Sequence, residues 1–88
     1  MTGAIYTIVF DYCGGTYVSQ AVAASPHSAI IEWGRTVDLS VMNVSEAERG
    51  TIVADLEEQG VVPLEGLVSV WCSYVLLNDI GGLATIVL

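Results

Sequence analysis

The acidic residues of this chain are concentrated in its middle, and that distribution limits the folds it can adopt. Eight of the ten acids lie between Glu32 and Glu65, and each flanking segment holds one. Hydrophobic residues make up 53% of the chain, which excludes intrinsic disorder because disorder needs low hydrophobicity. We therefore expect two strand-forming ends with one charge each around a charged helical centre, all within one small domain over residues 1–88.

The N-terminal segment has the pattern of two strands joined by a tight turn. Aromatic and branched residues alternate with a second set from residue 5 to residue 12, as in a strand with two distinct faces. Gly14 and Gly15 supply the positive φ angles that a two-residue turn needs, and residues 16–23 form the returning strand. With those two glycines as the turn, we expect Tyr12 opposite Tyr17.

Two helix starts follow the hairpin. Ser25 and Pro26 match an N-cap followed by proline at the first helical position. Ser45 and Glu48 match a capping box, which predicts a second helix over residues 46–59. Each helix has an apolar stripe at helical spacing: Ala29, Ile30, Trp33 and Val37 in the first, and Ile52, Val53 and Leu56 in the second. The connector between them is apolar, and we expect it to lie against the core.

The C-terminal segment has the pattern of two further strands, over residues 67–77 and 83–88, with a turn over residues 78–82. The element order is therefore ββ-α-α-ββ. Short hairpins favour antiparallel pairing, and helices grouped between them favour one covered face. The sequence predicts a two-layer α+β fold, with a four-stranded antiparallel sheet and two helices on one face.

The predicted sheet is unusually poor in charge. An antiparallel sheet with one wet face normally alternates apolar with polar residues, yet here the face opposite the aromatic residues is also rich in valine. Because the helices can cover only one side, we expect a second copy to cover part of the other, most simply as a homodimer. The expected interface residues are Val9, Val18, Val22, Trp71 and Val75.

The charge balance excludes several partners. The chain has two arginines, no lysine and a net charge of −8, so it lacks the cations that nucleic acid or anionic lipid would require. No basic segment typical of a signal peptide precedes Ile5. The apolar stretch over residues 66–88 is interrupted by turn-forming residues at 78–82, so we expect no membrane span and a cytoplasmic protein.

The candidate chemistry is weak. Cys13, His27 and Asp11 could be imagined as a nucleophilic arrangement, but a reactive cysteine needs an electropositive surrounding that this chain lacks. Cys13 and Cys72 do not have the spacing of metal ligands. The sequence does not decide whether a single disulfide joins them. We expect no catalytic residues, no metal and no cofactor, and hence a non-enzymatic interaction domain.

An alternative interpretation uses the acidic helices. The chain could be an inhibitor, immunity or antitoxin-like protein that covers a basic partner, because negative charge speeds association with basic surfaces. Its contact charges would be Glu46, Glu48, Asp55, Glu57 and Glu58. Salt sensitivity separates the two interpretations, since such binding weakens steeply with salt.

The order strand, Gly-Gly turn, strand and alanine-bearing helix over residues 6–31 resembles the start of HicB-type antitoxins. The resemblance covers less than a third of the chain. An acidic Pro-Gly segment associated with that family is replaced here by residues 23–26, and the later αββ order also departs from it. The resemblance therefore transfers no function and no site residues.

Overall fold

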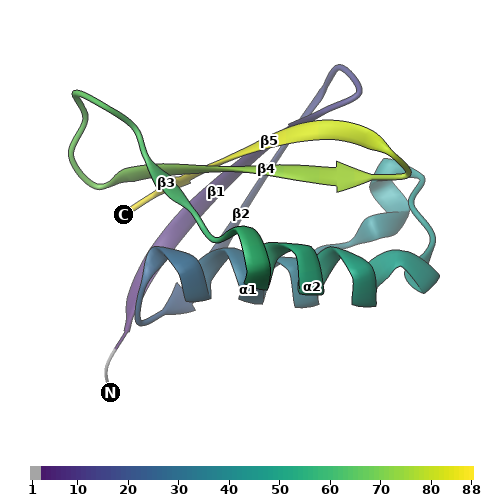
Figure 1. The fold of residues 1–88 in the computed structure, drawn as a ribbon, viewed down its shortest axis with the longest axis horizontal. Helices are drawn as coiled ribbons and strands as arrows, with labels where there is room; N and C mark the ends of the chain where they lie inside the picture. Colours follow the sequence, from purple (N-terminus) through teal and green to yellow (C-terminus); the bar gives the residue numbers. More distant parts are fainter. Residues whose placement is uncertain (1–2) are drawn as a thin grey trace.

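The computed structural model describes residues 3–88, which form a five-stranded antiparallel sheet with two α-helices on one of its faces (Figure 1). The α+β class is confirmed, but the sheet has five strands rather than four. In chain order the elements are β1 (Ala4–Tyr12), β2 (Gly15–Ala23), α1 (Pro26–Thr36), the 3₁₀ helices η1 (Leu39–Met42) and η2 (Glu46–Glu48), α2 (Arg49–Gln59), β3 (Val62–Pro63), β4 (Val70–Leu77) and β5 (Ile80–Val87).

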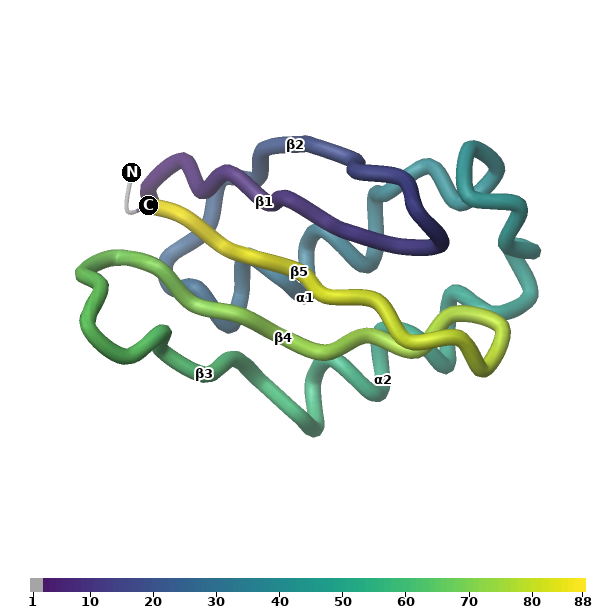
Figure 2. The backbone as a smooth tube through the Cα atoms, turned by 90° about the horizontal axis from the view of Figure 1, so that it is seen from above, coloured from purple at the N-terminus to yellow at the C-terminus, as the bar shows by residue number. Residues whose placement is uncertain are grey.

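The strand order across the sheet is β2-β1-β5-β4-β3, so two hairpins are joined side by side through β1 and β5 (Figure 2). Both hairpin turns lie at one end of the molecule, opposite the end where β1 starts and β5 finishes (Figure 2). The strand missed by the sequence interpretation is β3, in which Val62 pairs with Cys72 and Pro63 with Trp71. Two residues ending in proline carry no alternation signal, and proline is tolerated here because β3 is an edge strand.

The first hairpin turns one residue earlier than expected. The turn residues are Cys13 and Gly14, with φ angles of 49° and 79°, and Tyr12 pairs with Gly15. Two positive φ values are typical of the turn type that matches strand twist in two-residue hairpins. Phe10 therefore faces Tyr17, and the predicted Tyr12–Tyr17 pairing is wrong by two positions, a shift that leaves every side chain on its expected face.

The second hairpin turn is shorter than the expected 78–82 segment. Asn78 and Asp79 form it, with φ angles of 53° and 61°, and Leu77 pairs with Ile80. Gly81 and Gly82 belong to β5 instead. A Cβ built on Gly82 would lie 2.5 Å from Cζ of Phe10, so this glycine provides space for an aromatic ring rather than a bend.

The first helix begins as predicted, and the second helical segment also begins at the predicted residue, Glu46, but as a 3₁₀ turn and without the predicted capping box. The Ser25 hydroxyl caps α1 by accepting a hydrogen bond from the Ser28 amide. At the second helix the Ser45 hydroxyl accepts from the Ala47 amide, and the Glu48 carboxylate accepts from the Asn78 amide at 3.3 Å. The reciprocal capping box is therefore absent in this segment, and the helix starts with the 3₁₀ turn η2 before α2.

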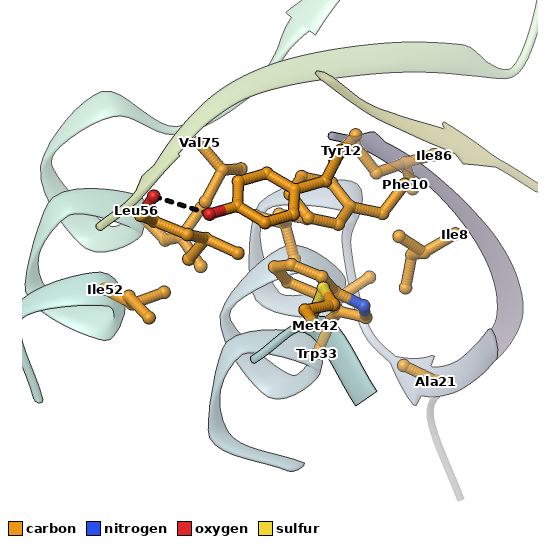
Figure 3. Close-up of a cluster of buried hydrophobic side chains, with 14 of the residues drawn as sticks. Ile8, Phe10, Tyr12, Ala21, Trp33, Met42, Ile52, Leu56, Val75 and Ile86 are labelled. Atoms are coloured by element: carbon orange, nitrogen blue, oxygen red, sulfur yellow. Dashed lines mark hydrogen bonds between the residues drawn. The ribbon is translucent and has the colours of Figure 1, made fainter. Parts of the chain in front are cut away.

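The core lies between the sheet and the two helices (Figure 3). Phe10 is at its centre, with its ring centroid 4.9 Å from that of Trp33 and 5.7 Å from that of Tyr12. The Tyr12 hydroxyl donates to the buried Leu77 carbonyl at 2.8 Å and so ties β1 to the end of β4 (Figure 3). The connector packs against this core as expected, through the buried side chains of Leu39, Met42 and Val44.

Candidate functional site

The helices leave one face of the sheet uncovered, since both α1 and α2 lie on the opposite face (Figure 1). Paired residues on adjacent strands share a face, so the ladders identify its members. We call this surface the outer face; its residues are Ile5, Thr7, Val9, Asp11, Thr16, Val18, Gln20, Val22, Val62, Val70, Cys72, Tyr74, Leu76, Leu83, Thr85 and Val87.

Exposed apolar side chains are concentrated on the outer face. The total exposed area of 5023 Å² is close to the roughly 5,000 Å² expected for a folded monomer of this mass. The unusual feature is where the exposed apolar side chains lie. Of the twelve exposed large hydrophobic residues in the described chain, seven lie here: Ile5, Val18, Val22, Val62, Tyr74, Leu76 and Leu83. Monomeric proteins rarely leave contiguous apolar surface of this kind uncovered.

The outer face is also nearly free of charge. Asp11 is its one charged member among residues 3–88, and its carboxylate accepts a hydrogen bond from the Thr16 hydroxyl at 2.8 Å. One unbroken row of side chains crosses all five strands, from Val18 through Val9, Thr85 and Cys72 to Val62. A second apolar sheet could pack against this row without separating ion pairs or burying a lysine.

The structure divides the expected interface residues into two groups. Val9, Val18 and Val22 are on the outer face, with Val18 and Val22 64% and 54% exposed. Trp71 and Val75 point toward the helices: Val75 is buried in the core, and Trp71 packs edge-on against Tyr6. Both alternating sets of β4 are apolar, so its sequence pattern alone could not show which set faces inward.

The exposed outer-face residues of the β4–β5 hairpin that the interface prediction missed are Tyr74, Leu76 and Leu83. The Asn78–Asp79 turn carries part of the missing signal, because its position fixes the β4–β5 register and thus which residues of the two strands share a face. Asparagine and aspartate tolerate the left-handed conformation, so this pair was the available clue.

A groove of about 430 Å³ lies along the free edge of β2. Its lining residues are Thr16, Tyr17, Val18, Ser19, Gln20, Trp33, Thr36, Val37, Asp38 and Val41, and we call it the β2 groove. The first five are consecutive in one strand. Consecutive side chains of a strand point to opposite faces of the sheet. All five residues can therefore line the same groove only if the groove runs along the edge of the strand, where both faces meet. The opposite wall comes from the end of α1 and from η1.

The β2 groove carries one charge among its lining residues, that of Asp38. Its Oδ1 accepts two hydrogen bonds from Ser40, from the hydroxyl at 2.6 Å and from the amide at 3.0 Å. The hydrogen bond from the Ser40 hydroxyl, and after it the one from the Ser40 amide, hold the pKa of Asp38 below its ordinary value. The carboxylate is therefore charged at neutral pH.

The five acids of the alternative interpretation do not form one free surface. Glu46 is paired with Arg49, whose Nε donates to its Oε2 at 2.7 Å, and Glu48 accepts from the Asn78 amide. Glu57 and Glu58 are exposed on the last turns of α2, where Asp55 is half-buried.

The structure does not bring the candidate nucleophile and base together. Cys13 is at the β1–β2 turn, whereas His27 is in the first turn of α1, beyond the opposite end of β2. The nine residues of β2 separate these ends by roughly 27 Å. Both cysteines are free. Within residues 3–88, no group of three or more histidine, cysteine or acidic side chains could hold a metal ion.

Comparisons with protein-family models, with curated proteins and with solved structures found no match to this chain. The similarity of residues 6–31 to HicB-type antitoxins is therefore a similarity of local element order alone. Neither α-helix in the described part of the chain has the length and apolarity that a membrane crossing requires.

Proposed function

We propose that this protein is a non-enzymatic interaction domain that associates with a second copy of itself through the outer face. The single observation that carries the proposal is the coincidence of many exposed apolar side chains and one charge on a sheet face that the helices leave open. Burial of such a face stabilises an assembly in proportion to the apolar area removed from water.

The distribution of the acids supports the same arrangement. Nine of the ten acids lie off the outer face, and seven of them belong to the segment from α1 to α2, residues 26–59, on the other side of the sheet. Two copies that met face to face would keep these charges at the two far sides of the assembly. A homodimer is the simplest such assembly, because one surface then serves both copies.

Binding to a basic protein partner is the second candidate function. The positions of the acidic residues in this chain argue against it. Arg49 offsets the charge of Glu46, and the Glu48 carboxylate is already turned toward the Asn78 amide within the chain. Salt distinguishes the candidates: contact through an uncharged face keeps its strength at high ionic strength, whereas acid-to-base contact weakens.

Leu83→Lys tests the proposal. Leu83 lies on β5, the middle strand, and pairs with Asp11, which would give the new lysine a partner in the isolated chain. The matched control is Val68→Lys, at an exposed position in the loop before β4, off the outer face. We expect sedimentation equilibrium to show dimers for the parent and for Val68→Lys, and dimer affinity at least tenfold weaker for Leu83→Lys. Equal affinities for the two variants would refute this use of the outer face.

A further inference from the structure

The edge of β2 is open in a way that the opposite edge of the sheet is not. Ladder hydrogen bonds occur at alternate pairs, and in a two-residue hairpin the first bonded pair flanks the turn, here Tyr12 and Gly15. The odd-numbered residues of β2 therefore bond to β1. Their even-numbered neighbours direct N–H and C=O groups away from the sheet; these are Thr16, Val18, Gln20 and Val22.

The other edge is protected. There β3 covers part of β4, ends in Pro63, and is followed by a loop whose Leu64 amide bonds back to the Val70 carbonyl. At the turn that follows β4, the Glu48 carboxylate accepts a hydrogen bond from the Asn78 amide. By contrast, the nine residues of β2 include no lysine, glutamate or proline, the residues that usually block an edge from pairing.

We infer that the edge of β2 and the β2 groove together bind an extended peptide segment of another protein, with apolar side chains and a lysine or arginine facing the helices. Outward backbone groups of β2 would form a new antiparallel or parallel ladder with the segment, as in other cases of strand addition. Every second side chain of the added strand then points toward the helix side, where the groove lies.

The groove lining specifies those side chains. Val37 and Val41 offer an apolar wall, and Val41 is 57% exposed although Leu39 and Met42 in the same 3₁₀ helix are buried. Asp38 sits in the same wall and is the one charged lining residue. An apolar side chain next to a cation is therefore complementary to the site, and the net charge of −8 favours a basic segment over an acidic one.

A second copy paired through β2 does not fit this site. Its helix-facing residues would be Tyr17, Ser19 and Ala21, which are small or already packed against their own core. It would present neither a large free apolar side chain nor a cation to the groove. The inference does not depend on self-association through the outer face.

The test uses two blocked synthetic peptides, TLTKTLT and TLTETLT, whose leucines and central charge share one face of a strand. The Val18→Pro variant removes an outward amide within the groove, and Val22→Pro removes one on the same edge beyond it. Neither change breaks the ladder to β1, and each removes one valine from the outer face, so they are matched.

We expect the lysine peptide to bind the parent and Val22→Pro saturably in NMR titrations and to slow amide exchange at Gln20. Affinity for Val18→Pro should be at least tenfold weaker, and the glutamate peptide should bind more weakly than the lysine peptide. Asp38→Asn, which keeps the acceptor for Ser40, should remove most of the difference between the peptides. No saturable binding by the parent, or equal binding by the two proline variants, would overturn the inference. The inference would also be overturned if Val18→Pro were monomeric while the parent and Val22→Pro were dimeric, because the edge of β2 would then bind a second copy of the chain.

Discussion

The ring of Phe10 occupies the place that a side chain on Gly82 would take. A Cβ at Gly82 would lie 2.5 Å from Cζ of Phe10 and 3.0 Å from the backbone oxygen of Asp11. Phe10 is fully buried and packs against Trp33, so the ring has no free direction in which to move. The most central contact of the core thus depends on the absence of a side chain in the neighbouring strand.

Gly82→Ala should therefore destabilise the fold, by about 1–3 kcal/mol as expected for an overpacked core. The control is Gly50→Ala in α2, where an added Cβ meets nothing within 4 Å. That change should raise the free energy of unfolding by up to about 1 kcal/mol, since alanine favours helix over glycine. Urea unfolding of both variants measures the difference, and an unchanged midpoint for Gly82→Ala would contradict this packing.

Arg49 should matter more for stability than Arg35, the other arginine of the chain. The Arg49 guanidinium donates to the carbonyls of Gly34 and Val37, each at 2.9 Å, and so caps the end of α1. Arg49→Met should cost about 1–3 kcal/mol, because part-buried carbonyls would lose their donors. Arg35→Met removes only an exposed contact with Glu32 at 4.0 Å and should change stability by less than about 0.5 kcal/mol. Equal losses in thermal or urea unfolding would contradict the capping role.

The pairing of Glu46 with Arg49 should make stability depend on acidic pH. Hydrogen bonds from Arg49 hold the pKa of Glu46 below its ordinary value of 4.5. The unfolded chain therefore takes up this proton at a higher pH than the folded chain, so the stabilisation is present above pH 4.5 and is lost as the pH falls through the lowered pKa.

Glu46→Gln should accordingly flatten the fall in unfolding free energy below pH 4.5. The control is Glu57→Gln, at an exposed position on α2. Urea unfolding across pH 3–7 measures both slopes. An identical acid slope in the parent and Glu46→Gln would show that the ion pair contributes nothing measurable in solution.

The turn at Cys13 offers a test of the hairpin register. Cys13 holds a left-handed conformation with φ 49°, which asparagine tolerates and a β-branched residue does not. Cys13→Val should destabilise by about 1–2 kcal/mol. Cys13→Asn should leave stability unchanged or raise it, because Asn-Gly is the preferred pair for this turn. If Gly14 and Gly15 formed the turn instead, Cys13 would be a strand residue and Cys13→Val would be the more stable of the two variants.

Local signals in the sequence predicted most of the fold. Alternation in β1 gave the correct inward set, and Ser25 with Pro26 marked the start of α1, because both signals depend on neighbouring residues alone. The function of Gly81 and Gly82 could not be inferred in this way. Their roles depend on aromatic rings from Tyr74 and Phe10, which reach them across strand pairings.

The candidate surfaces were predicted only in part. An uncovered sheet face follows from the element order, and Val9, Val18 and Val22 were placed on it correctly by alternation. Val75 was placed wrongly, because a strand that is apolar on both faces carries no directional signal. The β2 groove could not be foreseen, since it forms where a strand edge meets Val37 and Val41, about twenty residues further along the chain.

Light scattering of the unmodified chain across 1–100 μM, in low and high salt, is the most direct test of self-association through the outer face. We predict a mass of twice the 9.3 kDa chain at the upper concentrations, unchanged by salt. A mass of 9.3 kDa throughout this range would contradict the proposed self-association.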